Sequence, residues 1–101
     1  MSIKYCCVIK APSEETLDKF LEILDKEGIW AQSRKDPGNI SYEYYRRISD
    51  PSEMILIEEW DSAELEAEHC TYWNVQRLRQ ARAELGISST KWNLMMTPFE
   101  G

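Results

Sequence analysis

One histidine and a set of aromatic side chains are the residues of this sequence best suited to chemistry. His69 is the only histidine of the 101 residues, and imidazole is the side chain that titrates near neutral pH without perturbation. Glu58 lies two residues before Trp60, so on an extended strand both side chains point to the same face. The candidate walls of a pocket are Tyr42, Tyr44, Trp60, Tyr72, Trp73 and Trp92. This set predicts a site that binds a small, flat, largely apolar ligand and takes a proton from it.

Each of these residues also has a purely structural interpretation. His69 could equally make no more than a hydrogen bond to a neighbour, and Trp60 could simply pack in the core, as large aromatic residues at strand ends usually do. Tyr72 and Trp73 are adjacent on a predicted helix, so only one of them is expected to face a pocket. The arginines of that helix are most simply a solvated face, although Arg77 could hold an anionic substrate.

Motifs for metals, phosphates and nucleophilic catalysis are missing from the sequence. No Gly-x-Ser-x-Gly turn is present, and the four glycines are scattered rather than gathered in a phosphate-binding loop. One histidine without a Cys-x-x-Cys pair gives no tetrahedral metal site. We therefore expect no metal and no organic cofactor. Cys6, Cys7 and Cys70 are interpreted as reduced thiols that act as small hydrophobic residues, because nothing places a base beside them.

Length and charge exclude several classes of protein. A chain of 101 residues predicts a single domain over residues 1–101. The net charge of −6 repels a phosphate backbone, so we expect no nucleic-acid partner. No run of 18 apolar residues is present, so no membrane-spanning helix is expected. The N-terminus lacks a signal-peptide pattern, and the expected location is the cytoplasm.

The first half of the chain predicts the elements that form the floor and one wall of the ligand-binding site. Ile3 to Lys10 is apolar on both faces, which is typical of a central strand. Ser13 caps a helix whose apolar residues recur at helical spacing. Those residues are Leu17, Phe20, Leu21 and Leu24. Gly28 breaks or caps this helix, and Ile29 to Arg34 predicts a second short helical piece.

A hairpin is predicted in the middle of the chain. Pro37-Gly38 is a turn signal, and residues 40–48 then alternate with a period of two. Asp50-Pro51 is a second turn, and the strand from Met54 to Ile57 is apolar on both faces.

A helix and a last strand are predicted after the hairpin. Asp61 and Glu64 form a capping-box pattern that starts the helix. A kink is expected at residues 70–72, and Gly86 ends the helix. Its second half carries the apolar stripe Val75, Leu78, Ala81 and Leu85. Ser89 to Thr97 predicts the final strand.

The order strand, helix, strand, strand, helix, strand predicts an α+β fold. It is the ferredoxin-like split β-α-β arrangement, a four-stranded antiparallel sheet with helices on one face only and strands one and three in the middle. The other face is apolar and the chain is too short to cover it, which predicts a partner on that face.

Four features in order resemble the antibiotic biosynthesis monooxygenase family of small dimeric α/β-barrel proteins. They are Pro37-Gly38, Tyr42-Glu43, Glu58-x-Trp60, and His69 nine residues after Trp60. The resemblance implies a homodimer in which two sheets face each other. It also implies a cofactor-independent monooxygenase that oxidises a small phenol- or quinol-like substrate with O2. On this hypothesis His69 is catalytic, and the substrate-binding residues are Tyr44, Glu58, Trp60, Tyr72 and Trp73.

The sequence departs from parts of the family pattern. Many members have a second histidine where this chain has Asn74, and haem-degrading relatives have an asparagine in the first strand, which Ile3 to Lys10 lacks. Haem degradation is therefore disfavoured. Two other functions stay open: an isomerase or lyase that uses His69 for proton transfer on a small ketone, and a non-catalytic small-molecule-binding dimer.

Overall fold

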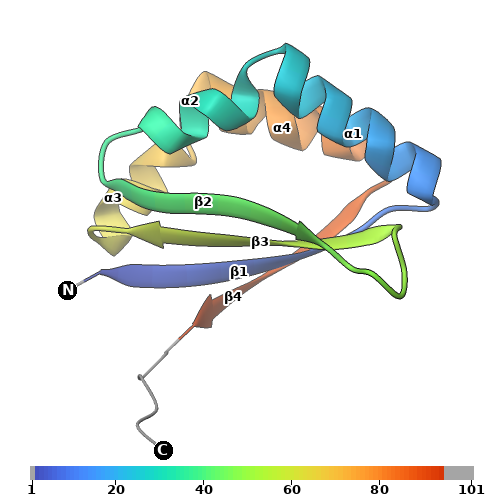
Figure 1. The fold of residues 1–101 in the computed structure, drawn as a ribbon. Helices are drawn as coiled ribbons and strands as arrows, with labels where there is room; N and C mark the ends of the chain where they lie inside the picture. The colour runs from blue at the N-terminus through green and yellow to red at the C-terminus, as the bar shows by residue number, and fades with distance from the viewer. Residues whose placement is uncertain (1, 95–101) are drawn as a thin grey trace, which may run out of the picture.

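In the part of the chain that the structure describes, four strands form one antiparallel sheet, and four helices cover one of its faces (Figure 1). The computed structural model describes residues 2–94. In chain order the elements are β1 Ile3–Lys10, α1 Glu14–Lys26, α2 Ile29–Lys35, β2 Asn39–Arg46, β3 Glu53–Trp60, α3 Ala63–His69, α4 Trp73–Glu84 and β4 Ser88–Leu94. The α+β, ferredoxin-like prediction is confirmed.

The sheet has the strand order β2-β3-β1-β4, so the two strands that are apolar on both faces lie in the middle, as predicted. β1 and β3 pair along their whole length, from Ile3 opposite Trp60 to Lys10 opposite Glu53. Burial along β3 alternates, because every second side chain points to the helices. Its buried residues are Met54, Leu56, Glu58 and Trp60.

Helix starts follow local capping chemistry. The Ser13 hydroxyl accepts a hydrogen bond from the Thr16 amide at 3.1 Å, which confirms the predicted cap of α1. The predicted capping box of Asp61 with Glu64 is wrong by one residue. Ser62 caps α3 instead, accepting from the Leu65 amide at 3.2 Å. The Asp61 amide donates to the Gly38 carbonyl at 2.8 Å, which holds Asp61 beside the turn before β2 and starts the helix one residue later.

A break at Cys70–Tyr72 divides the helical region after β3 into α3 and α4. The sequence predicts a kink in one helix at this point, and the structure has two helices. The helical phase is not continued across the break, so residues on either side of it do not share one face. His69, which ends α3, is buried, whereas Trp73, which begins α4, is 57% exposed.

The predicted strand ends differ slightly from the observed ones. β2 ends at Arg46, and Ile48, which the alternation places in the strand, lies beyond it and is fully exposed. β4 is described to Leu94, and the predicted continuation to Thr97 lies outside the described residues. Across residues 2–94, no helix is both long and apolar enough to cross a membrane.

The sheet face opposite the helices, called here the helix-free face, carries a row of apolar side chains. Cys6 lies opposite Ile57 on one side and Trp92 on the other, and Ile55 lies opposite both Val8 and Tyr45. Trp92 is 58% exposed and Tyr45 is 54% exposed. Its apolar residues are Cys6, Val8, Tyr45, Ile55, Ile57 and Trp92, and the same register places the charged residues Lys4, Glu43 and Glu59 on this face.

Candidate functional site

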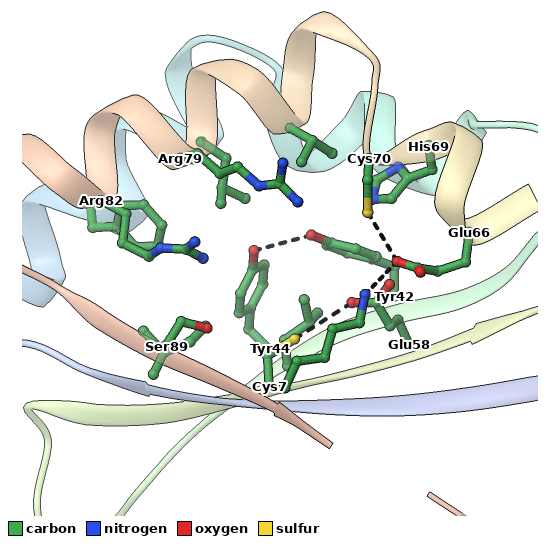
Figure 2. A pocket seen from close by; sticks show the side chains of 16 residues that line it. Cys7, Tyr42, Tyr44, Glu58, Glu66, His69, Cys70, Arg79, Arg82 and Ser89 are labelled. Carbon is green, nitrogen blue, oxygen red and sulfur yellow. Dashed lines mark hydrogen bonds and ion pairs between the residues drawn. The ribbon is translucent and has the colours of Figure 1, made fainter. Parts of the chain in front are cut away.

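A cavity of about 210 Å³ lies between the sheet and the helices (Figure 2). The sheet supplies its floor and α3 and α4 supply most of its roof, to which α1 adds Phe20, so residues from seven elements meet there. The lining residues used below are Cys7, Tyr42, Tyr44, Glu58, Glu66, His69, Cys70, Val75, Leu78, Arg79, Arg82, Ser89 and Lys91. The predicted pocket between sheet and helices is therefore present.

His69 lines this cavity and is hydrogen-bonded to a buried carboxylate. Its Nδ1 lies 2.6 Å from Asp36 Oδ2, and the two residues are 3% and 4% exposed. A carboxylate oxygen only accepts, so Nδ1 is the donor of this bond and Nε2 is the nitrogen left for another partner. The imidazole also packs against Trp60, with ring centroids 4.4 Å apart. This arrangement fixes both the tautomer and the orientation of the ring.

Asp36 is held by further hydrogen bonds behind His69. Asn74 Nδ2 donates to the same Oδ2 at 3.0 Å, and Gln32 Nε2 donates to Oδ1 at 3.0 Å. Asn74, which is fully buried, also donates to the Ser33 hydroxyl at 2.9 Å. The position that departs from the family pattern thus helps to position Asp36. Sequence reasoning missed Asp36; its one local signal is its place directly before the Pro37-Gly38 turn.

Glu58 and Trp60 share one face of β3, as their spacing predicts. Trp60 Nε1 donates to Glu58 Oε1 at 2.7 Å. Trp60 is completely buried and lies behind His69 and Glu58, outside the cavity lining. Glu58 does line the cavity, and burial raises the pKa of its carboxyl above the ordinary value.

A second carboxylate, Glu66, lies on the α3 side of the same cavity. Burial acts to raise the pKa of Glu66, but hydrogen bonds from Lys91 and Cys70 outweigh it and the pKa is lowered. Lys91 forms an ion pair with Glu66, and its ammonium lies 4.3 Å from the centre of the Tyr5 ring. Neither Glu66 nor Lys91 carries a sequence signal that separates it from a solvated surface charge.

Both cysteines at the cavity are held as thiols. Burial raises the pKa of Cys7 to about 12, and burial together with the neighbouring Glu66 raises the pKa of Cys70 to about 11. Because the thiolate is the reactive form, these values argue against nucleophilic roles. The three cysteines are all free. Within residues 2–94, no group of three or more His, Cys, Asp or Glu side chains is arranged to hold a metal ion.

The predicted aromatic walls divide into those that reach the cavity and those that do not. Tyr42 and Tyr44 line it, with ring centroids 5.7 Å apart and hydroxyl oxygens 3.4 Å apart. Burial raises the pKa of both phenols. Tyr72 and Trp73 are not among the lining residues, because the helix break turns them away from it, and Trp92 lies on the helix-free face.

Comparison with known proteins identifies the family of this chain. The family described as antibiotic biosynthesis monooxygenase matches residues 8–73. The match spans most of the chain, and the protein belongs to this family. Membership supports a general monooxygenase-like function. A search of curated proteins gave no match.

Several solved structures share the fold at low sequence identity. SnoaB, a cofactor-independent oxygenase from Streptomyces nogalater, is 9% identical with a TM-score of 0.77, covering 97% of this chain and 95% of its own. A structure described as antibiotic biosynthesis monooxygenase is 20% identical with a TM-score of 0.76, covering 94% and 99% of the two chains. A conserved protein from Bacteroides thetaiotaomicron is also 20% identical with a TM-score of 0.76, covering 92% and 97%. These likenesses concern the fold.

Proposed function

We propose that the protein is a cofactor-independent monooxygenase that oxidises a small phenol- or quinol-like aromatic with O2, and that His69 takes the substrate proton. The observation that carries this proposal is the buried His69–Asp36 pair at 2.6 Å on the cavity wall. A carboxylate that orients the ring and stabilises the imidazolium is the arrangement expected behind a general base.

The cavity can hold the ring of such a substrate against apolar and aromatic side chains. Tyr42 and Tyr44 lie on one side of it, and Val75 and Leu78 of α4 lie on the other. A substrate hydroxyl directed at His69 Nε2 would give up its proton there. Enclosure by the helices keeps bulk water from the anion that forms, which preserves its reactivity.

Once its hydroxyl has lost the proton, the aromatic ring is electron-rich enough to pass one electron to O2 directly. Recombination of the two radicals forms a carbon–oxygen bond, and loss of water leaves a carbonyl group. For a phenol with a free ring position, the balance is phenol plus O2 to quinone plus water. One oxygen atom enters the product and the other leaves as water, so no external reductant is required.

Oxygen uptake with a panel of quinols and naphthols tests this function. We expect one O2 consumed for each substrate oxidised, with label from ¹⁸O2 in the product and with no added flavin, haem or metal. Turnover of a substrate without oxygen uptake would contradict the oxygenase proposal. Dependence of the rate on a bound flavin that survives dialysis would contradict its cofactor-independent form.

Glu58 supports a second candidate, an isomerase or lyase acting on a small ketone. Its carboxyl, whose pKa is raised by burial, lines the same cavity as His69. A carboxyl group and an imidazole in one pocket can move a proton between two atoms of a substrate. Deuterium exchange from D2O into a bound ketone, without oxygen uptake, would favour this candidate over the oxygenase.

The helix-free face supports a proposal about assembly. We propose that two copies pair through this face as a homodimer, which would cover Trp92, Tyr45 and their apolar neighbours.

A further inference from the structure

Two arginines of α4 differ from the other arginines of the chain. Arg34 pairs with Glu43, Arg46 with Asp18, Arg47 with Glu53, and Arg77 with Glu27. Arg79 and Arg82 make no ion pair with any residue between 2 and 94, and these are the two arginines that line the cavity.

Their placement brings two like charges side by side without a described carboxylate: Arg79 is exposed and Arg82 is half-buried. Residues 79 and 82 are three apart on one helix and therefore neighbours on its surface, where like charges repel. In an acidic chain of net charge −6, carboxylates are abundant, yet none lies within ion-pair distance of either guanidinium among the described residues. Figure 2 shows both guanidinium groups directed from the roof toward the cavity, Arg82 on the side of Ser89 and Arg79 above the Tyr42 and Tyr44 hydroxyls.

The charges of the cavity are arranged unevenly. Glu58, Glu66 and His69 lie together at the α3 end, and Arg82 lies with Ser89 at the opposite end, with Arg79 in the roof between (Figure 2). The carboxylates at the first end have partners of their own: Trp60 donates to Glu58, and Lys91 donates to Glu66. The arginine end therefore presents positive charge that no described carboxylate neutralises.

We propose that Arg79 and Arg82 form an anion subsite, and that the substrate is an aromatic acid whose carboxylate binds there while its hydroxyl faces His69. A guanidinium presents paired N–H donors that match a carboxylate, and the Ser89 hydroxyl can add a donor. The cavity of about 210 Å³ is below the ~300–1,000 Å³ typical of drug-sized ligands, which restricts the acid to one or two rings. This proposal specifies the substrate class of the site proposed above and rests on that function for its catalytic meaning.

Equilibrium binding of a matched pair of probes tests the subsite without requiring turnover. The pair is 6-hydroxy-2-naphthoate, whose hydroxyl and carboxylate lie at opposite ends of the ring system, and 2-naphthol, which lacks the carboxylate. Both are measured by isothermal titration calorimetry with the intact protein. We expect the naphthoate to bind at least ~10-fold more tightly, because a charge-assisted hydrogen bond contributes enough free energy for that ratio. The preference should shrink as salt is added.

Two variants and a control locate the effect. Arg79→Gln and Arg82→Gln should each reduce the naphthoate preference several-fold, and the double variant should abolish it. Arg77→Gln is the control. Arg77 is on the same helix but does not line the cavity, and it donates to the two carboxylate oxygens of Glu27 at 2.8 and 2.9 Å. The naphthoate preference of this variant should therefore stay unchanged. Equal affinity for the two probes, failure of both to bind, or a preference that survives in the double variant would overturn the proposal.

Failure of the subsite and failure of the oxygenase function give different results. Naphthoate-selective binding that depends on Arg79 and Arg82, without oxygen uptake from any quinol acid, supports the subsite and contradicts the oxygenase. Oxygen uptake that is equally efficient with a neutral quinol and its carboxylated analogue supports the oxygenase and overturns the subsite.

Discussion

His69 and Asp36 illustrate how one hydrogen bond changes what a residue can do. On a solvated helix, His69 would be an ordinary surface residue. Here it is buried, its Nδ1 donates to a carboxylate 2.6 Å away, and its ring rests on Trp60. These contacts leave one orientation of the imidazole, in a residue that lines the cavity. That geometry is the basis of the proposed role as general base.

Glu58 and Glu66 should change stability with opposite dependence on pH. Burial raises the pKa of Glu58, so as the pH rises above the ordinary carboxyl value the unfolded chain loses its proton first and the free energy of unfolding falls. Glu58→Gln removes the ionisable carboxyl and with it this pH-dependent fall in the free energy of unfolding. We therefore expect the variant to be more stable than wild type at pH 8 and to differ less from it at pH 4, as measured by urea unfolding at both pH values.

Glu66→Gln is the comparison of opposite sign. The pKa of Glu66 is lowered by its hydrogen bonds from Lys91 and Cys70, so its contribution to stability is present above the ordinary carboxyl pKa and is lost as the pH falls. The variant should be less stable than wild type at pH 8, with a smaller difference at pH 4. The same pH trend in both variants would show that the assigned directions are wrong.

The sequence predicted part of the site, and the missing part has a physical cause. Glu58 and Trp60 could be assigned to one face because the period of a strand is two, and His69 stood out as the only histidine. Asp36 could not be assigned, because a carboxylate before a turn has the same local pattern whether it is buried or solvated. Its burial depends on His69, 33 residues away, and Asn74, 38 residues away.

At the scale of elements, the turn before β2 joins the site to the sheet. Gly38 has a φ of 84°, its carbonyl accepts from the Asp61 amide at 2.8 Å, and its Cα lies against Leu65 of α3. Asp36 lies two residues before this glycine. The turn therefore fixes the position of α3, which carries His69, relative to the segment that carries Asp36.

Gly38→Ala should destabilise the protein far more than the same change at Gly28. A Cβ at Gly38 would lie 2.5 Å from Leu65 Cδ1 and 2.8 Å from Leu65 Cβ, in addition to the left-handed backbone. We expect a loss of roughly 2–4 kcal/mol in the free energy of unfolding, from backbone strain and overpacking together. The measurement is urea unfolding, with one m-value (the slope of the free energy of unfolding against urea concentration) fitted to wild type and variants.

Gly28→Ala is the matched control because it has a similar φ of 70° and nothing within 4 Å of the added Cβ. Backbone strain alone predicts a loss of about 1–2 kcal/mol there. Equal losses at the two positions would mean that the contact with Leu65 contributes little, and that the turn does not fix α3.

The sequence periodicity predicts whether a segment is a helix or a strand. It does not predict which way the side chains of a helix face after a break in that helix. The strands, the cap at Ser13 and the end of α4 at Gly86 follow local patterns that the structure confirms. The sequence pattern places Tyr72 and Trp73 at the site only if one kinked helix runs through both. The break at residues 70–72 restarts the helix, so Trp73 points to solvent.

At the scale of the whole molecule, the two faces of the sheet differ in what covers them. The helices cover one face of the sheet (Figure 1). The helix-free face presents a row of apolar residues. Such a face is costly to leave in water, which is the physical reason for the homodimer proposed here.

Sedimentation at micromolar concentration should give about twice the chain mass of 11.9 kDa. Trp92→Glu places a charge on the helix-free face and should shift the protein toward monomer, because burying an unpaired charge is unfavourable. Trp73→Glu is the control: its tryptophan is 57% exposed, against 58% for Trp92, but it begins α4 in the helical layer. A wild-type monomer, or equal dissociation of the two variants, would refute the assignment of this face.

His69→Gln tests the central claim most directly. The variant should lower the rate of oxygen-dependent turnover by ~10²-fold or more, since general base catalysis is typically worth that much. Its pH–rate profile should lose the rise that accompanies deprotonation of the base. Unfolding and sedimentation should match wild type, which would show that the change is chemical. Near-wild-type turnover on a confirmed substrate, with the pH–rate profile unchanged, would contradict the role of His69 as proton acceptor.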